Sequence, residues 1–194
     1  MDQYSFGRAC KDAEQYQHIA IVIGSTYSQM KTVFPRPKMD RILTRMVESF
    51  VEETRPDLII SFCNQGWEIL GAEAAQRQRC SLGLITPNLK RESRWNAYTK
   101  ERLESVRSYA DITGFNLVYD SDGDSKAGVY ESYVNAIALA AIKSKKSLLI
   151  LDFGDHRRSI KDKALEGGLD VWNFLPAWEV EKNADHNKSN YTGA

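Results

Sequence analysis

The sequence predicts an open, doubly wound α/β domain built on a mostly parallel sheet. Continuous apolar runs at 18–24 and 147–151 are typical of central strands that helices cover on both faces. Segments with helical periodicity separate the predicted strands, so that strands and helices alternate along the chain. With 194 residues, the chain suits one well-buried domain rather than two. We expect that domain over residues 1–178 and a disordered polar tail over 179–194.

Three strands and two long helices are predicted in the first half of the chain. The strands are apolar runs at 18–24, 57–61 and 81–85. The first long helix begins at Met39, after two prolines that stop an earlier start, and it ends before Pro56. The second long helix runs from a turn at 64–66 to Gln78, and a short helix is expected at 6–16.

Three more strands and three more helices are predicted in the second half. The strands cover 111–118, 147–151 and 169–174. The helices run from the Trp95-Asn96 pair to Tyr109, from Tyr130 to Ile142 and from Ser159 to Glu166. For the last of these helices, the expected N-cap is Ser159 and the expected C-cap is Gly167 or Gly168.

Small or polar residues follow four of the predicted strands. The carboxyl ends of parallel strands meet at one edge of a sheet, and ligands of doubly wound sheets bind there, near a change in strand order. The turns at this edge are therefore candidate ligand contacts. The candidates are Gly24, Ser25, Thr26, Asn64, Gln65, Gly66, Thr86, Pro87, Asp152 and Gly154.

The stretch 61–75 combines a strand end, a glycine-containing turn and the start of a helix. This arrangement aims backbone N–H groups and the positive end of a helix dipole at an anionic ligand. Glu68 lies in the first helical turn, where a carboxylate stabilises the helix dipole by about 0.3–1 kcal/mol. A contact with a ribose hydroxyl is the alternative role for Glu68, and a tight turn without a ligand is the alternative for Gly66.

The same stretch resembles the Ser-Gly-Gly-Ala-x-Gly-x-Asp/Glu-x-x-Ala-Ala-Glu-x-Ala signature of the SLOG superfamily, a Rossmann-like group that includes DprA and LOG proteins. Its YpsA-like branch is the more similar one, because that signature continues with Thr-Pro, Trp-Asn and Ala-Asp pairs and a helical Asn. The matching residues here are Thr86-Pro87, Trp95-Asn96, Ala110-Asp111 and Asn135. The resemblance covers 19–174 and implies a Rossmann-like fold of SLOG type that binds a nucleotide or a nucleotide-derived ligand.

The chain departs from this family at two motifs. Phe62-Cys63 replaces the glycine pair of the signature, which leaves less room for a phosphate against the strand end. The Pro-Gly-Gly-x-Gly-Thr-x-x-Glu motif of LOG-type hydrolases has no counterpart, and Asp152-Phe153-Gly154-Asp155 occupies its approximate place. The resemblance therefore implies binding of a nucleotide or of an ADP-ribose-like or NAD-like ligand. It does not identify a cofactor, and it does not imply LOG-type catalysis.

Three further polar or aromatic residues have both a ligand-binding and a structural interpretation. Trp95 follows a basic loop, where its ring either stacks on a nucleobase or packs over the sheet edge. Asn96 accompanies it. Asn135 lies on a largely apolar helix, so its amide needs a partner if it is buried, either backbone or ligand. We count all three as candidate ligand contacts.

Composition restricts the partners and the location. Lys+Arg and Asp+Glu both number 26, a balance that argues against nucleic acid as a partner. No apolar run reaches the roughly 20 residues of a membrane helix, and the N-terminal sequence does not resemble a signal peptide. Three scattered cysteines favour reduced thiols without a metal site. We expect a cytoplasmic protein whose partner is a small nucleotide-derived ligand, with homo-oligomer formation left open.

Three hypotheses for function follow. The first is a binding or sensor protein that holds a nucleotide-derived ligand at the carboxyl edge of the sheet. The second is an enzyme that cleaves an N-glycosidic bond of a nucleotide, with Glu68, Glu131 or Asp152 as its acid/base group. The third is single-stranded nucleic-acid binding in the manner of DprA.

Overall fold

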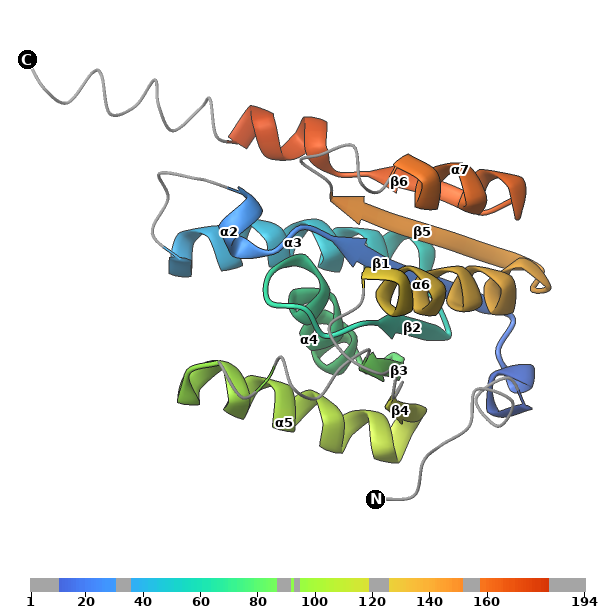
Figure 1. Cartoon of the computed structure of the whole chain (residues 1–194), viewed down its shortest axis with the longest axis horizontal. Helices are drawn as coiled ribbons and strands as arrows, with labels where there is room; N and C mark the ends of the chain where they lie inside the picture. The colour runs from blue at the N-terminus through green and yellow to red at the C-terminus, as the bar shows by residue number, and fades with distance from the viewer. Residues whose placement is uncertain are drawn as a thin grey trace, which may run out of the picture.

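The structure of the chain is a computed structural model, and it describes residues 11–30, 36–86, 92, 95–118, 126–151 and 158–181. Six strands form one sheet in the order β4-β3-β2-β1-β5-β6 (Figure 1). Every neighbouring pair is parallel. The strands are β1 His18–Gly24, β2 Leu58–Ser61, β3 Ser81–Thr86, β4 Phe115–Val118, β5 Lys145–Leu151 and β6 Asp170–Asn173. The chain therefore has the open, doubly wound α/β fold predicted from the sequence.

Helices cover both faces of the sheet, as Figure 1 shows for α6 on one face and α3 on the other. The described helices are η1 Ala13–Gln15, α2 Tyr27–Met30, α3 Arg36–Thr54, α4 Trp67–Gln78, α5 Ala97–Thr113, α6 Lys126–Ala141 and α7 Arg158–Glu166, with a further helix at 175–181. Helices α3, α4 and α5 pack on the first face, together with Trp178 from the further helix. Helices α6 and α7 pack on the second face.

Strand β1 explains the two-layer core. All seven of its residues are buried, and its side chains alternate between the faces, with Ala20 and Val22 on the first and Ile19, Ile21 and Ile23 on the second. Each fully buried isoleucine contributes about 1.5–3 kcal/mol. Strands β2, β3 and β4 follow one another outward on one side of β1. After β4 the chain passes through α6 to β5, which pairs with β1 on its other side. The strand order therefore reverses between β1 and β5.

Several predicted boundaries are wrong. Helix α3 begins at Arg36 rather than Met39, because proline is tolerated in the first helical turn, where its missing N–H has no helical partner, and Pro37 lies there. The strand predicted at 111–118 is too long, because α5 continues to Thr113 and β4 begins at Phe115. Ser159 is not an N-cap, since α7 already begins at Arg158.

Other boundary changes are small. The predicted helix at 130–142 corresponds to α6, which begins four residues earlier, and the predicted helix at 6–16 overlaps the short η1 in its described part. The four-residue helix α2 was not predicted. The helix at 175–181 continues beyond the expected domain boundary at 178, and residues 182–194 lie outside the described residues.

Helix α4 packs unusually closely on β1, because Gly71 faces Val22. A Cβ atom at Gly71 would lie 2.6 Å from Val22 Cγ1 and 2.9 Å from Cγ2. Three small residues of the same helix, Ala72, Ala74 and Ala75, are also buried. The helix therefore lies nearer the strand than a larger side chain at position 71 would allow.

Gly71→Ala is expected to lower the free energy of unfolding by about 1–2 kcal/mol, since the overpacking cost exceeds the gain in helix propensity. Urea unfolding followed by circular dichroism measures this change. Introduced into a Val22→Ala variant, the same substitution should become neutral or stabilising, because the added methyl group fills vacated space. An equal loss in both backgrounds would show that Val22 is not the cause.

His18 lies buried at the start of β1, with its Nε2 3.3 Å from Ser147 Oγ. Burial lowers the pKa of His18 below its usual 6.5, although the Thr54 backbone and the charges of Asp57 and Asp170 oppose the shift and Lys145 adds to it. The unfolded chain therefore binds a proton at His18 at a higher pH than the folded chain does.

The stabilising effect of this difference is fully present above about pH 6.5 and is lost as the pH falls through the lowered pKa. We expect the urea midpoint of the wild type to fall more between pH 8 and pH 5 than that of His18→Gln, which cannot titrate there. Equal decreases in the two proteins would show that His18 does not contribute to acid sensitivity.

Candidate ligand-binding site

The carboxyl ends of β1, β2 and β3 bring together most of the described candidate residues. Gly24 ends β1, and Ser25 and Thr26 follow it. The turn of Asn64, Gln65 and Gly66 follows β2 and leads into α4, and Thr86 ends β3. Pro87, Asp152 and Gly154 lie outside the described residues. The predicted common edge is thus confirmed for the turns after β1 and β2 and for the end of β3.

Polar side chains are buried at this edge to an extent that the rest of the core does not share. Of the nine buried polar or charged side chains among the described residues, five lie here. They are Ser25, Ser61, Asn64, Glu68 and Thr86. Burying such groups costs free energy unless they are hydrogen-bonded, so their concentration at one edge needs a local cause.

Glu68 is the centre of this polar cluster and is fully buried. Its Oε1 accepts hydrogen bonds from the Gly24 N–H at 3.3 Å and from the Tyr133 hydroxyl at 2.9 Å. Its Oε2 accepts from the Asn64 N–H at 3.2 Å and from Asn64 Nδ2 at 2.6 Å. The carboxylate therefore joins the ends of β1 and β2 to the middle of α6.

Ser61 and Tyr133 complete the cluster. The Ser61 hydroxyl donates to the Glu68 carbonyl at 2.7 Å, which ties the end of β2 to the first turn of α4. Asn64 Nδ2 also lies 3.3 Å from the Tyr133 hydroxyl. Tyr133 was not among the residues predicted from the sequence, whereas Asn135, which lies half-buried on the same helix, was. Helix α6 carries several polar residues besides Tyr133, so nothing in the sequence indicates this tyrosine specifically.

The two glycines at this edge make room for the chain itself. A Cβ atom at Gly24 would lie 2.2 Å from Trp67 Cδ1, because the buried Trp67 indole packs directly over β1. Gly66 has φ 117°, and a Cβ atom there would lie 2.6 Å from the Ser25 carbonyl oxygen. The Trp67 N–H donates to that same oxygen at 3.2 Å, so the two turns are joined by backbone.

Phe62 and Cys63 lie between the end of β2 and the turn at 64–66. Cys63 has φ 58°, the left-handed conformation that glycine adopts most easily. Phe62 is buried and packs edge-on against Tyr133, with ring centroids 4.4 Å apart. Burial raises the pKa of the Cys63 thiol, which argues against a nucleophilic role.

The rim of the edge is formed by more exposed side chains. Thr26 and Gln65 are half-buried, and Asn96 is exposed. Asn96 is the N-cap of α5, and its side chain accepts a hydrogen bond from the Thr99 N–H at 2.9 Å. Trp95 is half-buried and packs against the core on the α3 side of the sheet. Asn96 and Trp95 thus both have structural roles.

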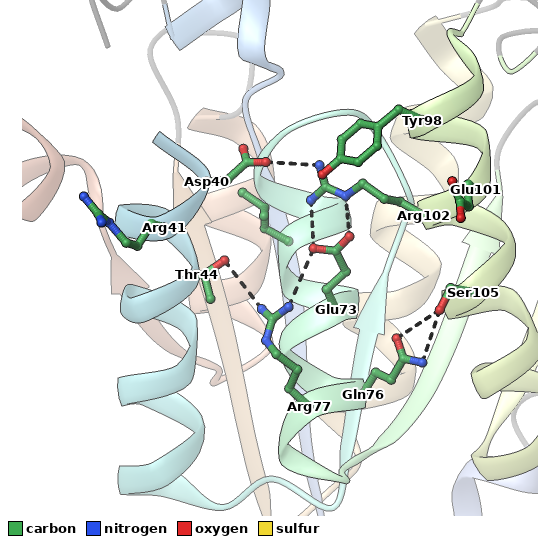
Figure 2. Close-up of a pocket in the computed structure, with 11 residues that line it drawn as sticks. Asp40, Arg41, Thr44, Glu73, Gln76, Arg77, Tyr98, Glu101, Arg102 and Ser105 are labelled. Carbon is green, nitrogen blue, oxygen red and sulfur yellow. Dashed lines mark hydrogen bonds and ion pairs between the residues drawn. The ribbon is translucent and has the colours of Figure 1, made fainter. Parts of the chain in front are cut away.

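A groove of about 520 Å³ lies near this edge, between α3 and α5 and over the outer surface of α4 (Figure 2). Figure 2 shows Arg102 of α5 reaching across α4 toward α3. Its guanidinium forms a two-bond ion pair with Glu73, one bond being 2.7 Å, and lies 3.1 Å from Asp40 Oδ2. Burial lowers the pKa of Arg102, but the hydrogen bonds and charges of Glu73 and Tyr27 together outweigh it and raise that pKa overall.

A second arginine of the groove, Arg77, also forms ion pairs. Arg77 lies 2.7 Å from Glu48 and 3.8 Å from Glu73. Arg102 further donates to the Tyr27 hydroxyl at 3.4 Å, which links the groove to the turn after β1. The groove was not predicted, because its residues come from three helices with no common motif.

Of the three residues proposed as acid/base groups, the two described ones lie in different surroundings. Glu68 is enclosed, Glu131 is exposed on α6, and Asp152 lies outside the described residues. No group of three or more His, Cys, Asp or Glu side chains there could hold a metal ion. No described helix is both long and apolar enough to cross a membrane.

Two solved structures share this arrangement of strands and helices. DNA processing protein A (DprA) from Streptococcus pneumoniae matches with a TM-score of 0.50 and 13% identity, over 85% of this chain and 51% of that one. DprA from Helicobacter pylori matches with a TM-score of 0.53 and 14% identity, over 86% of this chain and 67% of that one. The fold is that of DprA.

The two DprA proteins are longer than this chain and share little sequence with it. The chain spans about half the length of the S. pneumoniae DprA. No protein-family model and no curated protein sequence matches the chain. Identities of 13% and 14% establish a shared DprA-like fold and leave the ligand to be inferred from the site.

Proposed function

We propose that the protein binds a nucleotide or a nucleotide-derived ligand at the carboxyl edge of the sheet, over the ends of β1, β2 and β3. The observation that carries this proposal is the concentration of buried polar side chains at that edge, centred on Glu68. A buried polar cluster stabilises a core less than apolar packing would, and proteins keep such clusters mainly at functional sites, where the hydrogen bonds fix the positions of nearby residues. The edge also adjoins the reversal of strand order between β1 and β5.

The order of motifs supports membership of the SLOG superfamily, and of its YpsA-like branch within it. The DprA-like fold agrees with the superfamily, which the sequence resembles from 19 to 174. Cys63 keeps a left-handed conformation at the position of a signature glycine. Glu68 stands at the Asp/Glu position of the signature, and Glu73 at its second acidic position.

Thermal-shift measurements with ATP, NAD, ADP-ribose and cyclic AMP test the proposal, since a ligand that binds only the folded state raises its melting temperature. We expect at least one of the four to do so. Gln65→Glu places a negative charge on the rim and should weaken the binding of that ligand about five- to tenfold. Gln78→Glu makes the same change at the other end of α4 and should leave the affinity unchanged.

Two outcomes would contradict the proposal. One is the absence of a shift with all four nucleotides. The other is an equal loss of affinity in Gln65→Glu and Gln78→Glu, because the ligand would then respond to overall charge rather than to the edge. Gly66→Asp is not a suitable variant, since any side chain there meets the Ser25 carbonyl oxygen.

Binding of single-stranded nucleic acid is the second candidate. The observation that favours it is the shared fold with H. pylori DprA, whose solved structure concerns single-stranded DNA binding. The balanced charge of 26 basic and 26 acidic residues weighs against it. Fluorescence anisotropy with a labelled oligothymidylate separates the two candidates. If the protein binds nucleic acid, its affinity should fall steeply between 50 and 200 mM salt, because the slope of log affinity against log salt is roughly proportional to the number of phosphates contacted.

A further inference from the structure

Glu68 lies at the position where a strand-end turn of this fold would otherwise bind a phosphate. Phosphates bind to backbone N–H groups at a strand end and at the start of the next helix. Here the Gly24 and Asn64 N–H groups, at the ends of β1 and β2, both donate to the Glu68 carboxylate, at 3.3 and 3.2 Å. The carboxylate is itself in the first turn of α4, near the positive end of the helix dipole.

Other N–H groups of the same turns also donate to the chain. The Ser25 N–H donates to the Leu151 carbonyl at 2.7 Å, and the Trp67 N–H donates to the Ser25 carbonyl at 3.2 Å. The space beside Gly24 is filled by the Trp67 indole, and the space beside Gly66 by the backbone at Ser25 and Thr26. Four amides that could hold an anion are therefore already hydrogen-bonded within the protein.

We infer that the Glu68 carboxylate occupies the anion-binding position of this edge and thereby excludes phosphate from the Gly24 and Asn64 amides. The inference rests on the proposed function and specifies its ligand. The part of the ligand that lies over the 64–66 turn therefore carries no negative charge. A phosphate beside Glu68 would meet a like charge in a buried site, where repulsion is weakly screened.

Titration of the wild type with inorganic phosphate, followed by ¹H–¹⁵N NMR, tests this inference. Sodium chloride at matched ionic strength is the control. We expect the Gly24 and Asn64 amide resonances to respond equally to both salts. In Glu68→Ala, phosphate but not sodium chloride should move these two resonances along a saturating curve. The apparent affinity for phosphate at these amides should be at least tenfold higher in Glu68→Ala than in the wild type.

Saturating movement of the Gly24 and Asn64 resonances in the wild type would overturn the inference, and so would their failure to respond in a folded Glu68→Ala protein. If Glu68→Ala does not fold, Glu68→Ser takes its place, because it keeps one acceptor while vacating the same space. This test is independent of the nucleotide screen. Failure of every nucleotide to bind would contradict the proposed function, whereas the phosphate titration reports on Glu68 alone.

Discussion

Gly66→Ala is expected to lower the free energy of unfolding by about 3 kcal/mol or more, because the backbone conformation at this position is nearly exclusive to glycine. Its φ of 117° and ψ of −128° lie outside the regions that residues with a Cβ atom adopt readily. The added Cβ would also lie 2.6 Å from the Ser25 carbonyl oxygen and 2.9 Å from the Tyr27 nitrogen. Both neighbours are backbone atoms, so they cannot move aside as a flexible side chain could.

Gly168→Ala is the matched control. Gly168 also has a positive φ, 69°, but the nearest atom to an added Cβ is Lys146 Cε at 3.6 Å. We expect a loss of about 1 kcal/mol, the cost of a left-handed conformation alone. Urea unfolding of both variants gives the comparison. Similar losses in the two would mean that the contact between the turns after β1 and β2 contributes little to stability.

Arg102→Met is expected to destabilise the protein by about 2–3 kcal/mol, somewhat less than the loss of one partner from a fully buried ion pair. The Arg102 side chain is only 11% exposed, and its partners Glu73 and Asp40 are 15% and 19% exposed. Removing the guanidinium takes away the ion pair of Asp40 and leaves Glu73 only its 3.8 Å contact with Arg77. Methionine retains most of the aliphatic packing, so the loss reports on the charge.

Arg77→Met removes a second arginine that contacts the same Glu73 and serves as the control. Arg77 is 44% exposed, so its pairs with Glu48 and Glu73 should contribute less than about 1 kcal/mol. Chemical unfolding at low and at high salt should show a clear difference between the two variants. If Arg77→Met lowers the free energy of unfolding as much as Arg102→Met does, burial does not explain the contribution of the Arg102 ion pairs to stability.

The sheet could be predicted from the sequence because its central strands are buried on both faces. The run 19–23 has no polar position, which distinguishes it from surface strands and from amphipathic helices. The prediction at 111–118 was wrong for a related reason. Ile112 and Thr113 are β-branched residues typical of strands, but Ile112 lies 84% exposed on the last turn of α5. Tertiary position overrode the local preference there.

The positions of the site residues could be predicted, but their partners could not. The sequence predicts Gly24 and Gly66 as candidate ligand contacts, with a tight turn as the alternative for Gly66, and it does not indicate what fills the space beside them. Trp67 and the Ser25 carbonyl fill it. Likewise, the contact of Glu68 with Tyr133 joins residues 65 positions apart in the chain. Such a pair has no local sequence pattern, since it depends on how α6 crosses the sheet.

Binding of a nucleotide-derived ligand over the ends of β1, β2 and β3 can be tested by mapping the ¹H–¹⁵N resonances of the wild type with the nucleotide that gives the largest thermal shift. We expect the largest perturbations at Thr26, Gln65 and Asn96, around the rim of the edge. Perturbations confined to the groove over α4, at Thr44, Gln76 and Tyr98, would contradict binding at this edge.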